Sequence, residues 1–499
     1  MLNKFTRGFG LILCFLIVSS VFYLFTFNSG YGYDALEYLV IGRSLLDGYP
    51  FYTFVPSKSL GLYYFVASFL LLGNVSNHYS ISLLITLIFS STLLFTFFIV
   101  RRKFNDRVAL ISSLLVGICG VFMDLNFLEP EGLVYIFGLL GFYCISNAVK
   151  RQRNRGLFIG GLWIGAGCSF KAVAGFYWLA SAIFIFFWEY FIAHNKISDI
   201  IKKELIIFCG LSITIIMPIG YFALSGGLWE HLEWTYFFPL FKYPSHLHWF
   251  YKLYTKLLWF FILVPTVFIY SLRANLRKKI YSSPNNIFIM VLGFIFLIPL
   301  FKTQAPHYVY PGAAFLSIFS AVVIDEETKR RGARFSIRIP AFALLLIFFV
   351  CAISIYLYYP SAIKRLHSFS DYSYETYLKA SIQKYVPSGK KVLYFRCDPF
   401  LYWISERYPN FPLVYLSVQG AYVLEKNPEL LLRALGDPNL CLVEFNPELI
   451  DFIDSDFLKK KQNTLLLETF SKILNKRFVI SDINFKPYVF WIRRDLLNK

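Results

Sequence analysis

The chain has 499 residues, of which 57% are hydrophobic and only 16% are charged. Because so few charged side chains cannot solvate a water-soluble chain of this length, we exclude a soluble globular protein. The formal net charge of +19 would suggest nucleic acid, but the basic residues gather in short segments between apolar runs. That pattern is typical of cytoplasmic loops beside anionic lipid. We therefore expect a membrane protein that does not bind nucleic acid.

Apolar runs of about twenty residues, long enough to cross a bilayer as helices, recur up to residue 360. The first, Leu11–Phe27, follows Lys4 and Arg7 and could be a secretory signal peptide. No small-residue cleavage site follows it, however, and many spans do, so we interpret it as the first span with a cytoplasmic N-terminus. The basic clusters assigned to the cytoplasm are Lys4/Arg7, Arg101–Arg107, Lys150–Arg155, Lys202/Lys203, Arg273–Lys279 and Lys329–Arg338.

This alternation predicts about eleven spans, the last near Ala341–Tyr359. An odd number of spans places the C-terminal tail outside the cytoplasm. We expect a mainly α, polytopic helix bundle over residues 1–360, in the inner (plasma) membrane, and an extracytoplasmic domain over residues 361–499.

The first outer loop, residues 28–80, is long for a connection between two spans. A helical stretch at Asp34–Leu46 is followed by a turn at Gly48–Pro50 and an apolar stretch at Leu60–Leu72. The last stretch is short for a span, and counting it as one would break the charge alternation. We interpret it as a helix along the membrane surface.

The tail alternates strand-like and helical runs, which predicts a small α/β domain. Cys397 and Cys441 lie in this tail and could pair only in an oxidising compartment. The expected strands are Lys391–Arg396, Leu440–Phe445, Arg477–Ser481 and Tyr488–Arg493, and the expected helices are Pro399–Arg407, Pro428–Leu435 and Leu465–Leu474.

Acidic residues follow two of the spans at the predicted outer face. Asp34, Glu37 and Tyr38 share one helix face, although Asp34 and Glu37 could simply form a capping box. Glu129 and Glu131 follow the third span, where an ordinary interfacial loop is the alternative. Two carboxylates that converge there could act as a general base and as a group that positions a hydroxyl.

Cationic side chains are expected at the same face. Lys171 lies between two apolar runs, where an ionisable group is usually functional or paired. Lys58 precedes the surface helix, and His307 and Tyr308 open the tenth span, where both could instead be ordinary interfacial residues. Such cations are suited to bind a lipid-linked phosphate.

The order of these motifs resembles the membrane-embedded GT-C glycosyltransferases, in the bacterial branch related to protein O-mannosyltransferases and lipid A aminoarabinose transferases. Ser59 and Leu60 stand where that family often has proline, Glu131 replaces a more usual Asp and His307 replaces Arg. The tail has no motif that we can match. The segments that carry the resemblance are Asp34–Tyr38, Leu45–Tyr52, Lys58–Tyr64, Glu129–Val134, Gly161–Lys171 and Pro306–Pro311.

The resemblance implies an inverting transfer from a polyprenyl-phosphate sugar to an acceptor hydroxyl. Asp34 would be the general base, and Glu131, more than Glu129, would position the acceptor or the base. The remaining residues would bind the donor phosphate (Lys58, Lys171 and His307) or other parts of the substrates (Glu37, Tyr38, Glu129 and Tyr308). We expect no dedicated metal ligands and no certain cofactor, although the two acids could support a divalent metal.

The aromatic segment Trp229–Trp249 could form a wall for the sugar or the prenyl chain, or an ordinary interfacial belt. The sequence identifies neither the sugar, a hexosyl or pentosyl group, nor the acceptor, which could be a glycan, a lipid or a protein. A transporter or flippase of lipid-linked glycans is the main alternative, although no internal repeat supports it. A noncatalytic membrane scaffold is a third possibility.

Overall fold

The computed structural model describes residues 20, 33–54, 56, 58–73, 78–123, 125, 128–242, 272, 280–298, 306–331, 372–394, 399–410, 427, 429–445, 461–483 and 489–496. Apart from Ser20, the predicted span at Leu11–Phe27 lies outside these residues, as do the predicted span at Ala341–Tyr359 and Cys397. The described residues form two compact units. The first holds the described residues within 1–30, 77–228 and 244–362; the second holds those within 31–76, 229–243 and 363–499.

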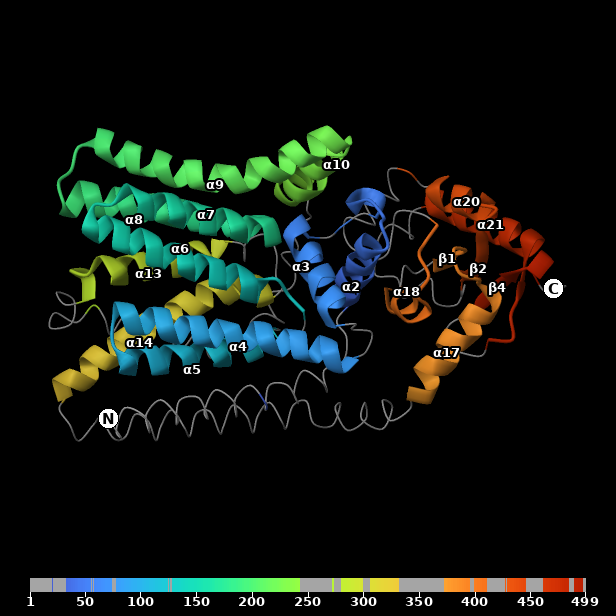
Figure 1. The fold of residues 1–499 in the computed structure, drawn as a ribbon, viewed down its shortest axis with the longest axis horizontal. Coiled ribbons are helices and arrows are strands. Elements are labelled where there is room, and N and C mark those ends of the chain that lie inside the picture. Colours follow the sequence, from blue (N-terminus) through green and yellow to red (C-terminus); the bar gives the residue numbers. More distant parts are fainter. Residues whose placement is uncertain are drawn as a thin grey trace. The chain divides into compact units, whose positions relative to one another are not determined.

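The first unit is helical, and its long helices lie side by side (Figure 1). Its elements are α4 (His78–Lys103), α5 (Asp106–Phe122), α6 (Glu131–Arg151), α7 (Asn154–Phe170), η2 (Ala172–Gly175), α8 (Phe176–Phe186), η3 (Phe187–Ile192), α9 (Ile197–Ser225), α13 (Pro284–Ile295), η7 (Pro306–Val309) and α14 (Tyr310–Arg331).

Five helical segments among the described residues are long and apolar enough to cross a membrane. The protein is therefore a mainly helical, multi-pass membrane protein, as expected, while the total of about eleven spans remains a prediction. Leu60–Leu72 and Pro284–Ile295 are shorter apolar helices. The five segments are Ile81–Lys103, Glu131–Arg151, Ala172–Ile192, Ile197–Ser225 and His307–Arg330.

Helices α7 and α9 approach closely because glycines line their contact. A Cβ atom at Gly161 would lie 2.1 Å from the Ile207 carbonyl oxygen, and one at Gly210 would lie 2.2 Å from that of Phe158. Small residues at such contacts let membrane helices pack backbone to backbone. This contact fixes α7, which ends at Phe170, directly before Lys171.

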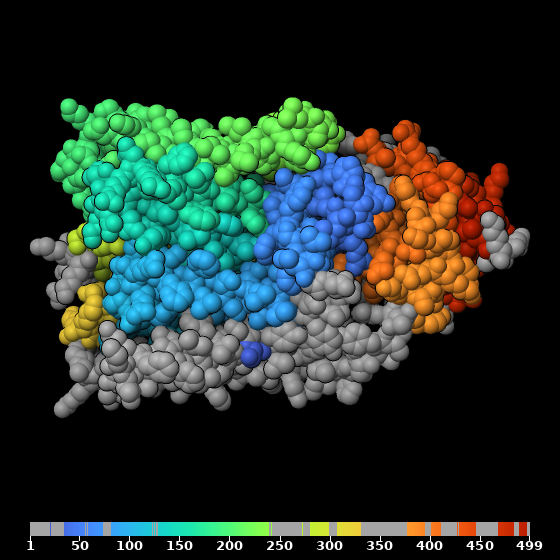
Figure 2. Space-filling model, in the orientation of Figure 1, coloured from blue at the N-terminus to red at the C-terminus, as the bar shows by residue number. Residues whose placement is uncertain are grey.

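The second unit combines the first outer loop with the tail. Its loop elements are α2 (Tyr33–Leu46), η1 (Phe51–Thr53) and α3 (Leu60–Gly73), and from residue 229 on it also holds α10 (Leu228–Leu232) and the π-helix η4 (Glu233–Lys242). The Arg43 guanidinium of α2 lies 3.8 Å from the ring centre of Trp403 and donates to its carbonyl oxygen at 3.1 Å. Tyr408 donates to Asp47. Within this unit the loop, in blue, and the tail, in orange, lie against each other (Figure 2).

The tail forms the predicted small α/β fold, with a four-stranded sheet in the order β1-β2-β4-β3. Strand β1 (Lys391–Tyr394) is parallel to β2 (Leu440–Glu444), and β4 (Phe490–Arg493) is antiparallel to β2 and to β3 (Phe478–Ile480). Cys441 is a free thiol on β2, and burial raises its pKa. The boundary at residue 360 remains a prediction. The helical elements of the tail are α17 (Tyr372–Tyr385), α18 (Pro399–Ser405), α20 (Glu429–Gly436), α21 (Lys461–Arg477) and η9 (Arg494–Leu496).

Candidate functional site

In the first unit, Glu131 and Lys171 form a buried ion pair. Glu131 is the first residue of α6, where the positive end of the helix dipole favours a carboxylate. Lys171 separates α7 from η2. Its backbone is extended, so its side chain does not continue a face of α7. The two side chains are only 3% and 8% exposed. Since a buried charge is costly unless paired, each of these residues stabilises the ionised form of the other.

Tyr308 and His307 complete the surroundings of this pair. The Lys171 ammonium lies 3.5 Å from the centre of the Tyr308 ring, within cation–π distance. Nε2 of His307 lies 4.0 Å from Oε1 of Glu131. The structure therefore brings together four of the predicted residues from three separate segments of the chain: the start of α6, the α7–η2 junction and η7.

Glu129 lies beside the same group. One of its carboxylate oxygens, one of Glu131 and one ring nitrogen of His307 all lie within 4.8 Å of one another, a spacing that could hold a metal ion. However, Oε1 of Glu131, the atom nearest His307, already accepts a hydrogen bond from Lys171. A divalent cation at that oxygen would meet the ammonium, so the triad fits a metal poorly.

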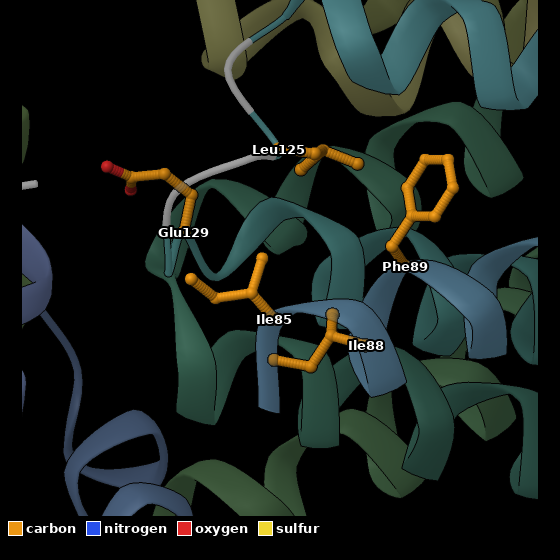
Figure 3. A pocket seen from close by; sticks show the side chains of 5 residues that line it. All are labelled: Ile85, Ile88, Phe89, Leu125 and Glu129. Atoms are coloured by element: carbon orange, nitrogen blue, oxygen red, sulfur yellow. The ribbon is translucent and has the colours of Figure 1, made fainter. Parts of the chain in front are cut away.

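Glu129 also lines a small pocket with Ile85, Ile88, Phe89 and Leu125. Figure 3 shows the Glu129 side chain at one end of this pocket and Phe89 at the other. The pocket has room for about one water molecule. The other four lining side chains are apolar, and the Glu129 carboxylate points away from them (Figure 3).

In the second unit, Asp34 and Lys58 form another ion pair. The Lys58 ammonium donates to Oδ2 of Asp34 at 3.0 Å, and the Tyr38 hydroxyl donates to the same oxygen at 3.4 Å. The Asp34 side chain is 28% exposed and that of Lys58 is 9% exposed. Helix α2 begins at Tyr33, so Asp34 lies in its first turn rather than at a cap. This acid is held by neighbours and is still open to water on one side.

Sequence reasoning missed Tyr63, which joins this second group. Its hydroxyl donates to Oε1 of Glu37 at 2.7 Å and accepts from the backbone N–H of Lys58 at 3.2 Å. Glu37 is buried, and so are Tyr38 and Tyr63. Only the position of Tyr63 in the apolar helix after Lys58 could have indicated this role.

The described part of the aromatic segment forms α10 and η4, and Tyr243 and Trp249 lie outside the described residues. Nδ1 of His231 lies 2.7 Å from the Tyr52 hydroxyl. Burial lowers the pKa of His231 to about 4 and raises that of Tyr52. The imidazole is therefore neutral at physiological pH, and its Nδ1 can accept from Tyr52. This bond ties the aromatic segment to η1 of the first loop.

All nine predicted site residues fall into two groups, one in each unit. Asp34, Glu37, Tyr38 and Lys58 gather on α2 and the turn before α3, and Glu129, Glu131, Lys171, His307 and Tyr308 gather at the ends of α6, α7 and α14. Each group contains carboxylates paired with one lysine. That the two groups form one site remains a prediction.

Together, the helical membrane fold and these acid–lysine groups define a multi-pass membrane protein with polar chemistry at its helix ends. A family model, described as dolichyl-phosphate-mannose-protein mannosyltransferase, matches residues 57–222. No curated protein sequence matches the chain. The matched segment contains Lys58, Glu129, Glu131 and Lys171.

Two solved membrane-protein structures share the fold of this chain. ArnT from Cupriavidus metallidurans bound to undecaprenyl phosphate superposes with a TM-score of 0.60 at 12% identity, covering 97% of this chain and 98% of that one. The oligosaccharyltransferase of Archaeoglobus fulgidus in its apo form gives a TM-score of 0.53 at 12% identity, covering 87% and 70%. The resemblance to the GT-C glycosyltransferases is thereby confirmed.

Proposed function

We propose that the protein transfers a sugar from a polyprenyl-phosphate donor to an acceptor hydroxyl at the outer membrane face, with inversion at the anomeric carbon. The observation that carries this proposal is that Asp34 and Glu131 each pair with a lysine, Lys58 and Lys171. A glycosyl transfer of this kind needs a base for the acceptor and cations for a departing phosphate. The family match and the shared fold support the choice of donor.

In this reaction Asp34 accepts the proton of the acceptor hydroxyl. The acceptor oxygen forms a bond to the anomeric carbon as the bond from that carbon to the phosphate oxygen breaks, and polyprenyl phosphate leaves with the electron pair. Asp34 suits this role because its carboxylate is the more exposed of the two paired acids. Glu131 positions the acceptor, and Glu37, Tyr38, Glu129 and Tyr308 bind other parts of the substrates.

The lysines stabilise the negative charge that develops on the phosphate. Lys58 and Lys171 donate through their ammonium groups, and His307 donates through its imidazole. While no donor is bound, the same ammonium groups neutralise Asp34 and Glu131. Donor phosphate would therefore compete with Asp34 for Lys58, so that binding of the donor also frees the base. We therefore expect the donor to bind before the acceptor.

The proposal includes a location. We infer the inner (plasma) membrane, with a cytoplasmic N-terminus and the site on the other side. This follows from the charge alternation of the predicted loops, and the acceptor would be a glycan, a lipid or a protein of the cell envelope. Labelling of a cysteine introduced at Ser57 tests it: labelling from the cytoplasmic side alone would contradict this orientation.

The activity itself is tested by mass spectrometry of cell-envelope glycans with and without the gene. We expect one sugar to be missing from one glycan, lipid or protein, and the purified protein to restore it from a polyprenyl-phosphate sugar. Export of an intact lipid-linked glycan without any change in its composition would favour the flippase alternative instead.

A further inference from the structure

Lys58 is linked to α2 in two ways, directly through its ammonium and indirectly, by way of Tyr63 of α3, through its backbone N–H. Its ammonium contacts Asp34 of α2, and its backbone N–H donates to the Tyr63 hydroxyl. That hydroxyl in turn donates to Glu37, which lies one helical turn after Asp34. The side chain and the main chain of Lys58 are therefore tied to neighbouring carboxylates on one face of α2.

The Tyr63 hydroxyl has little freedom to move. Its ring lies edge-on to Tyr38, with ring centres 5.7 Å apart, and 5.4 Å from the ring centre of Phe51. Tyr63, Tyr38 and Glu37 are all buried. Close packing of this kind fixes the rotamer, and hence the position of the hydrogen-bonding atom. The Tyr63 hydroxyl and the Glu37 carboxyl that accepts its hydrogen bond are therefore held in one position.

We infer that Tyr63 and Glu37 are a positioning pair that anchors the main chain at Lys58. When the main chain at Lys58 is anchored, the ammonium can move from Asp34 to the donor phosphate by rotation of the side chain alone. Without the anchor, the turn before α3 must be ordered each time the phosphate binds, and this ordering lowers the affinity. This inference deepens the proposed function, because it rests on the proposed role of Lys58 as a phosphate ligand.

The first test measures binding of undecaprenyl phosphate to the full-length protein in nanodiscs. Tyr63→Phe removes only the hydroxyl, and we expect its affinity to fall about fivefold to tenfold, the effect of losing one or two hydrogen bonds. Glu37→Leu should behave in the same way. Glu37→Gln should lose less, since its amide oxygen still accepts from Tyr63. Tyr64→Phe, on the same helix and 43% exposed, is the matched control and should bind as wild type.

A double-mutant cycle separates this role from a general loss of structure. If Tyr63 acts through Lys58, then Tyr63→Phe should cost nothing further in a Lys58→Ala background. An equal fivefold to tenfold loss in both backgrounds would overturn the inference. So would a wild-type affinity for Tyr63→Phe in a protein whose Lys58→Ala variant binds poorly.

Hydrogen exchange tests the anchor independently of the ligand. The Lys58 amide should be protected in the wild type and should exchange about tenfold faster in Tyr63→Phe, because its hydrogen-bond acceptor is gone. Unchanged exchange at Lys58 would refute the anchor whatever the binding data. Faster exchange together with wild-type binding by Lys58→Ala would instead refute the proposed role of Lys58 and leave the anchor standing.

Discussion

The two acid–lysine pairs of the molecule differ in their access to water. Asp34 lies on a helix of the first loop with 28% of its side chain exposed, whereas Glu131 lies at a helix start with 3% exposed. A base that exchanges a proton with an incoming hydroxyl must be reachable, but a group that only orients its neighbours need not be. The difference agrees with the proposed roles, proton transfer at Asp34 and positioning at Glu131.

The pairs also differ in how many segments they join. Asp34 and Lys58 are 24 positions apart in one loop. Glu131 pairs with Lys171 and lies beside His307, and so connects three segments of the first unit. Loss of the first pair should therefore affect the reaction more than the fold, while loss of the second should affect both.

The largest effect should come from Asp34→Asn. This change keeps the shape of the side chain but removes the base, so we expect the rate of sugar transfer to fall about 10²- to 10⁴-fold. The midpoint of thermal unfolding should change little. The measurement is transfer from a polyprenyl-phosphate sugar in membranes, and Asp106→Asn, at an acid that is 70% exposed, is the matched control. Transfer at the wild-type rate would rule out Asp34 as the base.

The next largest effect is on the free energy of unfolding, and it should differ between variants of the two lysines. Lys171→Met leaves Glu131 buried without its ion-pair partner and should lower the free energy of unfolding by about 3–5 kcal/mol. Lys58→Met breaks a pair that water reaches and should cost about 1 kcal/mol or less. Thermal unfolding of both variants in one detergent measures the difference. Adding Glu131→Gln to Lys171→Met should recover part of the lost free energy of unfolding. An equal loss in Lys58→Met and Lys171→Met would contradict the distinction between the exposed and the buried pair.

Within each of these regions, the sequence predicts the helices and strands better than it predicts the contacts between side chains. The sequence predicts a helix at Asp34–Leu46, and α2 spans Tyr33–Leu46; the strands of the tail also lie within the predicted runs. Hydrophobic periodicity and turn residues are local signals, and they are sufficient for such assignments. The sequence also singles out Lys171, because a lysine between two apolar runs is usually functional or paired.

Contacts between distant residues could not be predicted in the same way. Tyr63 meets Glu37 because the chain reverses between α2 and α3, and only packing decides which face of α3 turns inward. Similarly, the Tyr308 ring lies under Lys171 because η7 packs near the end of α7. Sequence placed both residues at a membrane face, but an interfacial tyrosine has the same pattern with or without such a partner.

A third prediction concerns His231, whose bond to Tyr52 supports the loop of the more exposed pair. Its pKa is about 4 in the folded protein, below the ordinary value of 6.5. Between these two values the unfolded chain binds a proton that the folded protein does not. The free energy of unfolding should therefore fall by about 1–3 kcal/mol as the pH drops from 6.5 to 4. His231→Asn should remove this component, and His194→Asn, at an exposed histidine, should not.

If both histidine variants kept the same pH dependence, acid instability would have to come from other groups. The measurement is thermal unfolding of each variant from pH 4 to pH 7 at constant ionic strength. The activity at pH 7 should be similar in all three proteins, because the imidazole of His231 is already neutral there.

The smallest expected effect is that of chelation, and it concerns the more buried pair. Glu129, Glu131 and His307 have the spacing of a metal site, but Lys171 already bonds to the oxygen of Glu131 that lies nearest His307. An ammonium at that oxygen supplies the positive charge that a divalent cation would bring. We therefore expect EDTA to change the rate of transfer less than about twofold. In Lys171→Met the same oxygen becomes available, and added Mn²⁺ should then bind where it does not in the wild type. Loss of wild-type activity with EDTA and its return with Mn²⁺ would show instead that the ammonium and a metal share Glu131.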